Sequence, residues 1–442
     1  MNIRLSDHFT YKKLAHFVLP SIIMMIFTSI YGVVDGLFVS NFVGKTAFAS
    51  LNFVTPFIMV LGGMGFMVGT GGSALVAREL GRGNREKADR YFTMMLIFTV
   101  LLGLVLTMGG LLFVRPISLM LGATEAMLED CVLYGSIVIS FTTAFMLQNV
   151  FQSFLVVAER PRLGLIFTVA AGVTNAILDA VFIIGFGWGL AGAALATGIG
   201  QCVGGLVPLV YFLRPGANLR LHKTWLEARP LLKACTNGSS ELMSNISSSI
   251  VSMLYNFQLL RLIGEDGVSA YGVLMYVQFI FIAIAIGYAI GSAPIVSYHY
   301  GAQNHGELKN MLRKSVTLAV GSGVVLTALA LALAGPLAKL FVGYDPGLYA
   351  LTVHAFRLFA FSFLLAGFNI FASGFFTALN DGGVSATISF LRTLVFQALS
   401  VLLLPLILGI DGIWWAITVA EVFACLISVI FLAAKRKKYH YI

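Results

Sequence analysis

Four acidic residues lie deep inside long apolar stretches of the sequence: Asp35, Asp179, Glu241 and Glu421. Ionisable groups at membrane depth cost free energy, and they usually serve a substrate path, an ion path or a proton relay. Asn175 precedes Asp179 by four residues, so both side chains fall on one face of a helix. Such a polar stripe must face protein or a cavity.

A hydroxyl in the next apolar stretch, that of Thr197, can join Asp35 and the Asn175–Asp179 face. Together they would offer two carboxylates, an amide oxygen and a hydroxyl. Hard oxygen ligands suit a cation such as Na⁺, and paired carboxylates suit a proton relay. Two structural alternatives stay open. Asp35 could lie in water near a helix end, and Asn175 and Asp179 could hydrogen-bond a neighbouring helix.

The seventh apolar stretch carries a second polar face, which starts at Glu241 and continues through Asn245 and Ser248. We expect this face to line a substrate cavity. Methionine adapts to varied ligands, although each methionine can equally be a core residue. Three further cavity candidates are Met24, Met64 and Met67.

Two further features bear on the interior of the helices. Glu421 and Arg357 are expected at similar depth, which predicts a buried structural ion pair. Pro20 lies inside the first apolar stretch and removes a backbone hydrogen bond there. It is a hinge candidate, and a static kink is the alternative.

Enzyme motifs are absent from the sequence: there is no GxxxxGK[ST], no HExxH and no GxSxG. We therefore expect no catalytic residue and no cofactor, and active transport would have to draw on an ion gradient. The cysteines form no CxxC pair and are expected to be packing residues. No metal is predicted beyond a possible Na⁺ at the site of Asp35 and Asp179.

These residues must be positioned by membrane helices, because 59% of the 442 residues are hydrophobic and only 11% are charged. A soluble domain carries about 25% charged residues. A membrane helix needs about 20 apolar residues. The sequence predicts twelve such helices, at 14–40, 50–77, 91–114, 132–157, 163–185, 190–213, 234–261, 270–298, 315–338, 350–378, 384–409 and 413–434.

The distribution of positive charge predicts the orientation of these helices. Of the 28 lysines and arginines, 22 fall in the termini and in alternate loops. Only Lys45, Arg115, Arg261 and Lys339 fall in the other loops, and Arg357 and Arg392 fall within helices. Basic loops stay in the cytoplasm. We expect a multi-pass protein of the bacterial inner membrane, with both termini cytoplasmic and without a nucleic-acid partner despite the net charge of +9.

The sequence also repeats itself at an offset of 220 residues. Gly44 meets Gly264, and the motif at Gly81 and Asn84 meets Gly301 and Asn304. An even number of helices in each half places both halves in the same orientation. We predict an all-α polytopic fold of two pseudo-symmetric six-helix bundles around a central cavity. The predicted units are an N-terminal lobe at 1–213, a cytoplasmic linker at 214–233 and a C-terminal lobe at 234–442.

Over essentially its whole length, the chain resembles the multidrug and toxic compound extrusion family, most closely the bacterial branch of MepA-type and DinF-type members. The matching features are the two six-helix halves, the Tyr31…Asp35…Gly44 segment, the repeated Gly81 and Gly301 loops, and Glu241. The resemblance implies a cation site at the positions Asp35, Asn175, Asp179 and Thr197, and it associates Pro20 with bending of the first helix. In one departure, the stretch 350–378 lacks the aspartate of NorM-type members, which puts a second cation site in doubt.

The resemblance implies a monomeric antiporter that exports amphipathic organic cations or drugs in exchange for H⁺ or Na⁺, in contact with membrane lipids. A lipid-linked precursor flippase of the same superfamily is the main alternative, although such flippases carry a strongly basic cavity. The loop at Ala77–Asn84 does not fit the GxxxDRxGRR pattern of a major-facilitator antiporter. A passive channel and a membrane-embedded transferase remain as alternatives from other classes.

Overall fold

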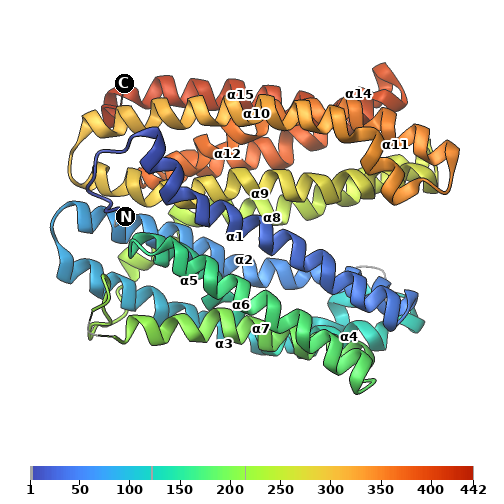
Figure 1. The fold of residues 1–442 in the computed structure, drawn as a ribbon, viewed down its shortest axis with the longest axis horizontal. Helices are drawn as coiled ribbons and strands as arrows, with labels where there is room; N and C mark the ends of the chain where they lie inside the picture. The colour runs from blue at the N-terminus through green and yellow to red at the C-terminus, as the bar shows by residue number, and fades with distance from the viewer. Residues whose placement is uncertain (1–2, 121–122, 215, 442) are drawn as a thin grey trace.

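A computed structural model describes residues 3–120, 123–214 and 216–441, which are almost entirely helical and contain no strand (Figure 1). Its helices are α1 (Tyr11–Phe42), α2 (Lys45–Gly81), α3 (Arg85–Met120), α4 (Glu125–Ser140), α5 (Thr142–Val157), α6 (Pro161–Asp179), η1 (Ala180–Gly185), α7 (Gly189–Phe212), α8 (Ala228–Leu262), α9 (Glu265–Gly301), α10 (His305–Val342), α11 (Pro346–Phe359), η2 (Ala360–Ser362), α12 (Phe363–Ala378), α13 (Gly382–Phe390), η3 (Leu391–Phe396), α14 (Gln397–Leu408) and α15 (Ile410–Tyr439). The predicted all-α polytopic fold is confirmed.

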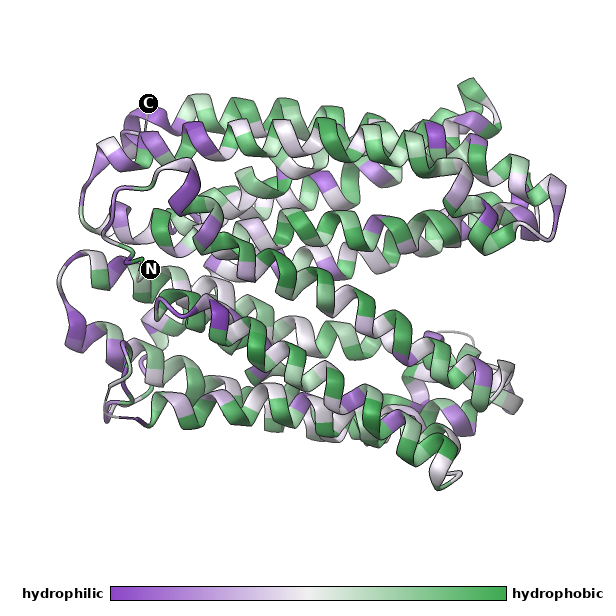
Figure 2. Ribbon diagram, viewed as in Figure 1, coloured by the Kyte–Doolittle hydropathy of each residue, from purple (hydrophilic) through white to green (hydrophobic). Residues whose placement is uncertain are grey.

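Every predicted membrane stretch coincides with one helix or with a chain of helices. Within the described residues, ten helices are long and apolar enough to cross a membrane. An eleventh span forms if α4 and α5, which meet at a bend of 53°, are taken as one. The remaining predicted stretch is α8, which is 35 residues long but too polar to pass the same test. Figure 2 shows the other helices as predominantly apolar along their middle parts.

The repeat in the sequence is also a repeat in the backbone. The bounds of α2 and α9 differ by 220 residues at both ends. Left-handed backbone angles recur at the same offset: Gly44 and Gly264 have φ of 129° and 91°, and Gly189 and Gly409 have φ of 54° and 61°. Glycine adopts these angles without a steric penalty. The two halves therefore reverse direction at equivalent residues.

Figure 1 shows α2 to α7 gathered below and α8 to α15 above, with α1 running between them. Both termini lie at the left end of the bundle in this view, together with the α2–α3 and α9–α10 turns. We call this end the terminal face, and the other end the opposite face.

The first helix of each half, α1 or α8, is buried at one end among residues of the other half and at its other end among residues of its own half. Near the terminal face, Leu14 and Phe17 of α1 are buried in a cluster with second-half residues such as Phe371, whereas Val39 is buried in a first-half cluster. In the second half, Ala234 of α8 is buried among first-half residues, whereas its later residues join the core of their own half. The two halves are thus interlocked at the terminal face.

Small residues make this interlocking possible, because they let helix backbones approach closely. A Cβ on Gly81 would lie 1.9 Å from the Tyr298 carbonyl oxygen, and one on Gly301 would lie 2.1 Å from the Arg78 oxygen. The ends of α2 and α9 therefore cross each other through a symmetric pair of glycines. Pro20 is buried within α1, which continues through it as one helix.

We expect Gly81→Ala to destabilise the protein by about 1–3 kcal/mol, the usual cost of overpacking, because a backbone carbonyl cannot move aside as a side chain can. Gly109→Ala is the control, since a Cβ there meets nothing within 4 Å. Thermal unfolding of the two purified variants measures the difference. Equal melting temperatures would show that the crossing is not tightly packed.

Candidate functional site

The four residues predicted to form a cation site come from three helices that pack together in the first half. Asp35 lies in the last third of α1, Asn175 and Asp179 on the last turns of α6, and Thr197 on α7. Directly after Asp179, α6 widens into the π-helical turn η1. Such turns are frequent at functional sites, because they re-aim the side chains beside them.

The structure brings all four side chains together. The carboxylate of Asp35 faces the carboxylate of Asp179, the amide of Asn175 and the hydroxyl of Thr197. The amide nitrogen of Asn175 lies 3.5 Å from the hydroxyl oxygen of Thr197. Asp179 is fully buried and Asn175 is 3% exposed, whereas Asp35 and Thr197 are half-buried. The site is therefore closed on the α6 side and more open beside α1.

Three of the four carboxylate oxygens of this site are buried without a hydrogen-bond partner in the part of the chain that the structure describes. These are both oxygens of Asp179 and Oδ1 of Asp35. Buried charges normally require pairing or coordination. Two facing carboxylates repel each other, so a proton or a bound cation would stabilise the pair. The oxygen donors fit Na⁺, because hard cations prefer oxygen ligands.

Sequence analysis missed Tyr134, which contributes to this site from α4. Its side chain is 4% exposed and lies beside Thr197, with the charges of both carboxylates acting on it. Tyr31 also lies close to Asp35, one turn earlier on α1. The spacing of Tyr31 and Asp35 was visible in the sequence. No pattern in the apolar stretch around Tyr134 indicated which helix it faces.

The cavity candidates of the second polar face lie apart from this site. Glu241 and Asn245 are half-buried on α8, and the charge that acts on Glu241 is that of Arg392 and not those of Asp35 and Asp179. Asn245 lies against α2, where a Cβ on Gly63 would be 3.5 Å from its amide nitrogen. This polar face therefore lies where the two halves meet.

The methionine candidates differ in their exposure. Met24 is 1% exposed and packs between α1 and α6 near Gly164. Met67 is 8% exposed within a first-half core, whereas Met64 is half-buried at the edge of that core. In this conformation Met24 and Met67 are buried core residues and do not line a cavity.

The ion pair predicted between Glu421 and Arg357 is wrong. Arg357 is exposed on α11, and Glu421 pairs with Arg392. The Arg392 Nε atom lies 2.9 and 3.0 Å from the two Glu421 oxygens, and Asn369 donates a third hydrogen bond at 2.7 Å. Both η3, which contains Arg392, and α11 pack against α15. The Arg392 side chain is 11% exposed at this contact, whereas the Arg357 side chain is exposed on α11.

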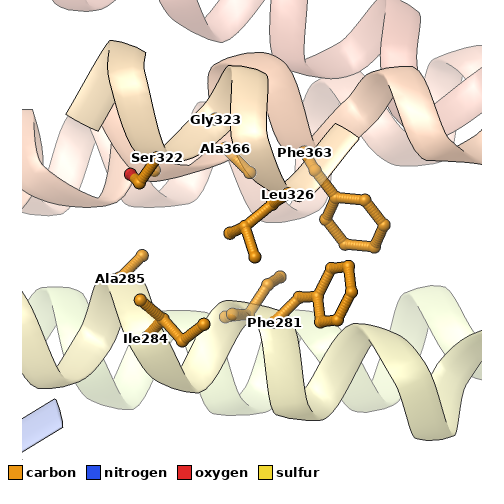
Figure 3. Close-up of a pocket in the computed structure, with 10 residues that line it drawn as sticks. Phe281, Ile284, Ala285, Ser322, Gly323, Leu326, Phe363 and Ala366 are labelled. Carbon is orange, nitrogen blue, oxygen red and sulfur yellow. The ribbon is translucent and has the colours of Figure 1, made fainter. Parts of the chain in front are cut away.

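Figure 3 shows a small apolar pocket in the second half, between Phe281, Leu326 and Phe363. Its volume of about 20 Å³ is close to the space that one water molecule needs. It lies outside both polar faces and is too small for an organic substrate.

The fold is that of a multi-pass helical membrane protein with a buried polar site between its first-half helices, and comparisons with known proteins place it among transporters and not enzymes. The family model MatE matches residues 20–181 and 242–402, which make up most of the two halves. The chain belongs to the MatE family.

Its relatives include the multidrug export protein MepA of Staphylococcus aureus strain MRSA252, which is 23% identical over 97% of this chain and 94% of the relative. MepA of Staphylococcus saprophyticus subsp. saprophyticus is 22% identical over the same shares. Among solved structures, a MATE protein in complex with MaL6 superposes with a TM-score of 0.92 at 21% identity, covering 97% of both chains. An outward-facing multidrug resistance MATE transporter of the MOP superfamily gives 0.91 at 22%, covering 97% of this chain and 96% of that chain.

Proposed function

We propose that this protein is a secondary active antiporter that exports amphipathic, often cationic compounds in exchange for H⁺ or Na⁺. The observation that carries the proposal is that the carboxylates of Asp35 and Asp179 face each other at membrane depth, with three of their four oxygens buried without a hydrogen bond. Its relatives named as multidrug export proteins support the substrate class.

In this proposal the carboxylate pair takes up a proton or Na⁺ from outside and releases it inside. Asn175 and Thr197 add neutral oxygens that hold the ion between the two carboxylates, and Tyr134 adds a hydroxyl. Protonation and Na⁺ binding compete, because both use the same oxygens. The pair then titrates as a unit.

The exchange ratio decides whether the membrane potential or the ion gradient drives export. One charge that moves down 100 mV yields about 2.3 kcal/mol, and tenfold accumulation costs about 1.4 kcal/mol. When one H⁺ or Na⁺ exchanges for one monovalent organic cation, no net charge moves. Export is then driven by the chemical gradient of the coupling ion alone.

The proposed substrate path lies between the halves along α8. Glu241 offers a negative charge to a cationic substrate, and Asn245 offers an amide on the same face. The polarity of α8 supports this role, because a helix of that composition is unfavourable against lipid. We propose that the protein acts as a monomer in the lipid bilayer and needs no cofactor.

Efflux of ethidium from membrane vesicles under an imposed pH or Na⁺ gradient tests this function. We expect ethidium to move against its concentration gradient only while one of the two ion gradients is present. Flux that runs only down the ethidium gradient, whatever the ion gradient, would identify a channel instead.

We further propose that the terminal face is cytoplasmic and that the membrane is the bacterial inner membrane. Most basic residues lie at this face, where Figure 2 shows the hydrophilic turns and chain ends. The linker 214–233 joins the halves at the same face, with residue 215 outside the described residues.

Engineered cysteines check this topology. A cysteine at Tyr344, which is 81% exposed at the opposite face, should react with an impermeant reagent added outside intact cells. One at Thr224 in the linker should stay silent until the membrane is opened. If only Thr224→Cys were labelled in intact cells, the orientation would be the opposite of the one proposed.

A further inference from the structure

Among the residues other than glycine that have a left-handed backbone, two lie at equivalent turns of the two halves. Glu159, between α5 and α6, has φ of 60°, and Asn380, at the equivalent turn between α12 and α13, has φ of 59°. This region is strained for a residue with a side chain, and it is kept where the surroundings hold it or where a function requires it. Asparagine tolerates it better than glutamate does.

Each of these turns makes a hydrogen bond to a segment that either belongs to the other half or packs against it. The amide of Asn380 donates to the Ala74 carbonyl of α2 at 3.4 Å. The Glu159 carboxylate accepts a hydrogen bond of 2.7 Å from the backbone N–H of Leu5, and one of 3.3 Å from Asn218 in the linker. Hydrogen bonds to a charged group are among the strong ones.

The segment 3–10 that contains Leu5 is anchored in the second half. Its side chains of Ile3, Leu5 and Phe9 are buried in a cluster that consists mostly of α1 and second-half residues, including those of α9 and α10, and has Val156 of α5 as its other first-half member. Glu307 at the start of α10 accepts the Phe9 N–H at 2.9 Å, and His8 lies 2.7 Å from the same carboxylate. Asn310 and Lys314 both donate to the Phe9 carbonyl.

We propose that segment 3–10 and Glu159 form a latch that keeps the terminal face closed. The segment moves with the second half, because its apolar side chains and Glu307 hold it there. Glu159 belongs to the first half. When the halves separate at the terminal face, the contact between Leu5 and Glu159 must break, and the equilibrium between closed and open states depends on its strength.

Glu159→Gly separates the latch from the stability of the turn. Glycine suits the left-handed backbone, so this variant removes the carboxylate and also relieves strain. Gln303→Gly is the matched control. Gln303 also has a left-handed backbone at the terminal face, with φ of 55°, and its side chain is exposed. Glu159→Gln keeps an acceptor for Leu5 but loses the charge.

The measurement is the distribution of distances between spin labels at Glu86→Cys and Lys309→Cys, in a background without the native cysteines. Both sites are exposed at the terminal face, one in each half. We expect Glu159→Gly to raise the ratio of long-distance to short-distance populations about tenfold, and Glu159→Gln about threefold. Gln303→Gly should match the wild type, and neither glycine variant should lower the melting temperature.

Two results would overturn the latch. One is a distance distribution of Glu159→Gly that equals that of the wild type. The other is an equal shift in Gln303→Gly, which would assign the effect to backbone strain and not to the lost carboxylate. Neither result depends on the coupling ion or the substrate, so the proposed transport function is tested separately.

Discussion

Asp35→Asn and Asp179→Asn should each abolish ion-driven efflux while leaving a folded protein in the membrane. Each change removes the charge from one of the two facing carboxylates. One remaining carboxylate can no longer share a proton or Na⁺ with its neighbour, so the coupling ion is not held. We expect the rate of gradient-driven ethidium export in vesicles to fall by at least about tenfold, equivalent to 1.4 kcal/mol or more of lost ion binding.

A control for this experiment is Asp411→Asn. Asp411 is an exposed carboxylate at the start of α15, where it pairs with His354 at 2.8 Å, far from the proposed coupling site. Its removal should leave export near the wild-type rate. If Asp35→Asn and Asp179→Asn also export against a gradient at that rate, the coupling site lies elsewhere, and Glu241 becomes the next candidate.

Glu421→Gln should be the most destabilising of the single substitutions considered. The carboxylate of Glu421 is 2% exposed and pairs with Arg392, whose side chain is 11% exposed. Removing one member of a buried ion pair leaves the other charge uncompensated and typically costs about 3–5 kcal/mol. Thermal unfolding in detergent should show a large drop in the melting temperature. Glu129→Gln, which breaks the exposed pair with Arg115, should change it little.

The double variant Arg392→Met/Glu421→Met tests whether this pair is structural. Apolar side chains of similar volume can replace a buried ion pair without loss of stability. We expect the double variant to regain most of the lost stability and to retain ion-driven export. A stable double variant without export would instead give Glu421 or Arg392 a part in transport.

The interlocking of the two halves at the terminal face bears on how the proposed cycle would proceed. The α1 helix carries Asp35 near the opposite face, where it packs with the first half, and its other end is buried in the second half. A change at the carboxylate pair is therefore connected through one continuous helix to segment 3–10. The proposed coupling site and the proposed latch lie at the two ends of the same element.

The sequence by itself determined the features that depend on composition and periodicity. Long apolar stretches specified the membrane helices, because each backbone polar group in lipid must be satisfied within its own helix. The repeat at 220 residues predicted equivalent turns, and Gly44 and Gly264 take left-handed angles in both halves. Asn175 and Asp179 were predicted to share a helix face, because the helical repeat places residues four apart on one side.

Tertiary structure alone decided which faces of different helices meet. The partner of Glu421 depends on the π-helical turn that contains Arg392, and the sequence carries no signal for such a turn. Tyr134 joins Thr197 only because α4 packs beside α7. The burial of segment 3–10 in the second half depends on contacts some 300 residues apart, such as that of Phe9 with Glu307. Hydropathy and spacing describe single helices, whereas these contacts arise from how rigid helices fit against each other in three dimensions.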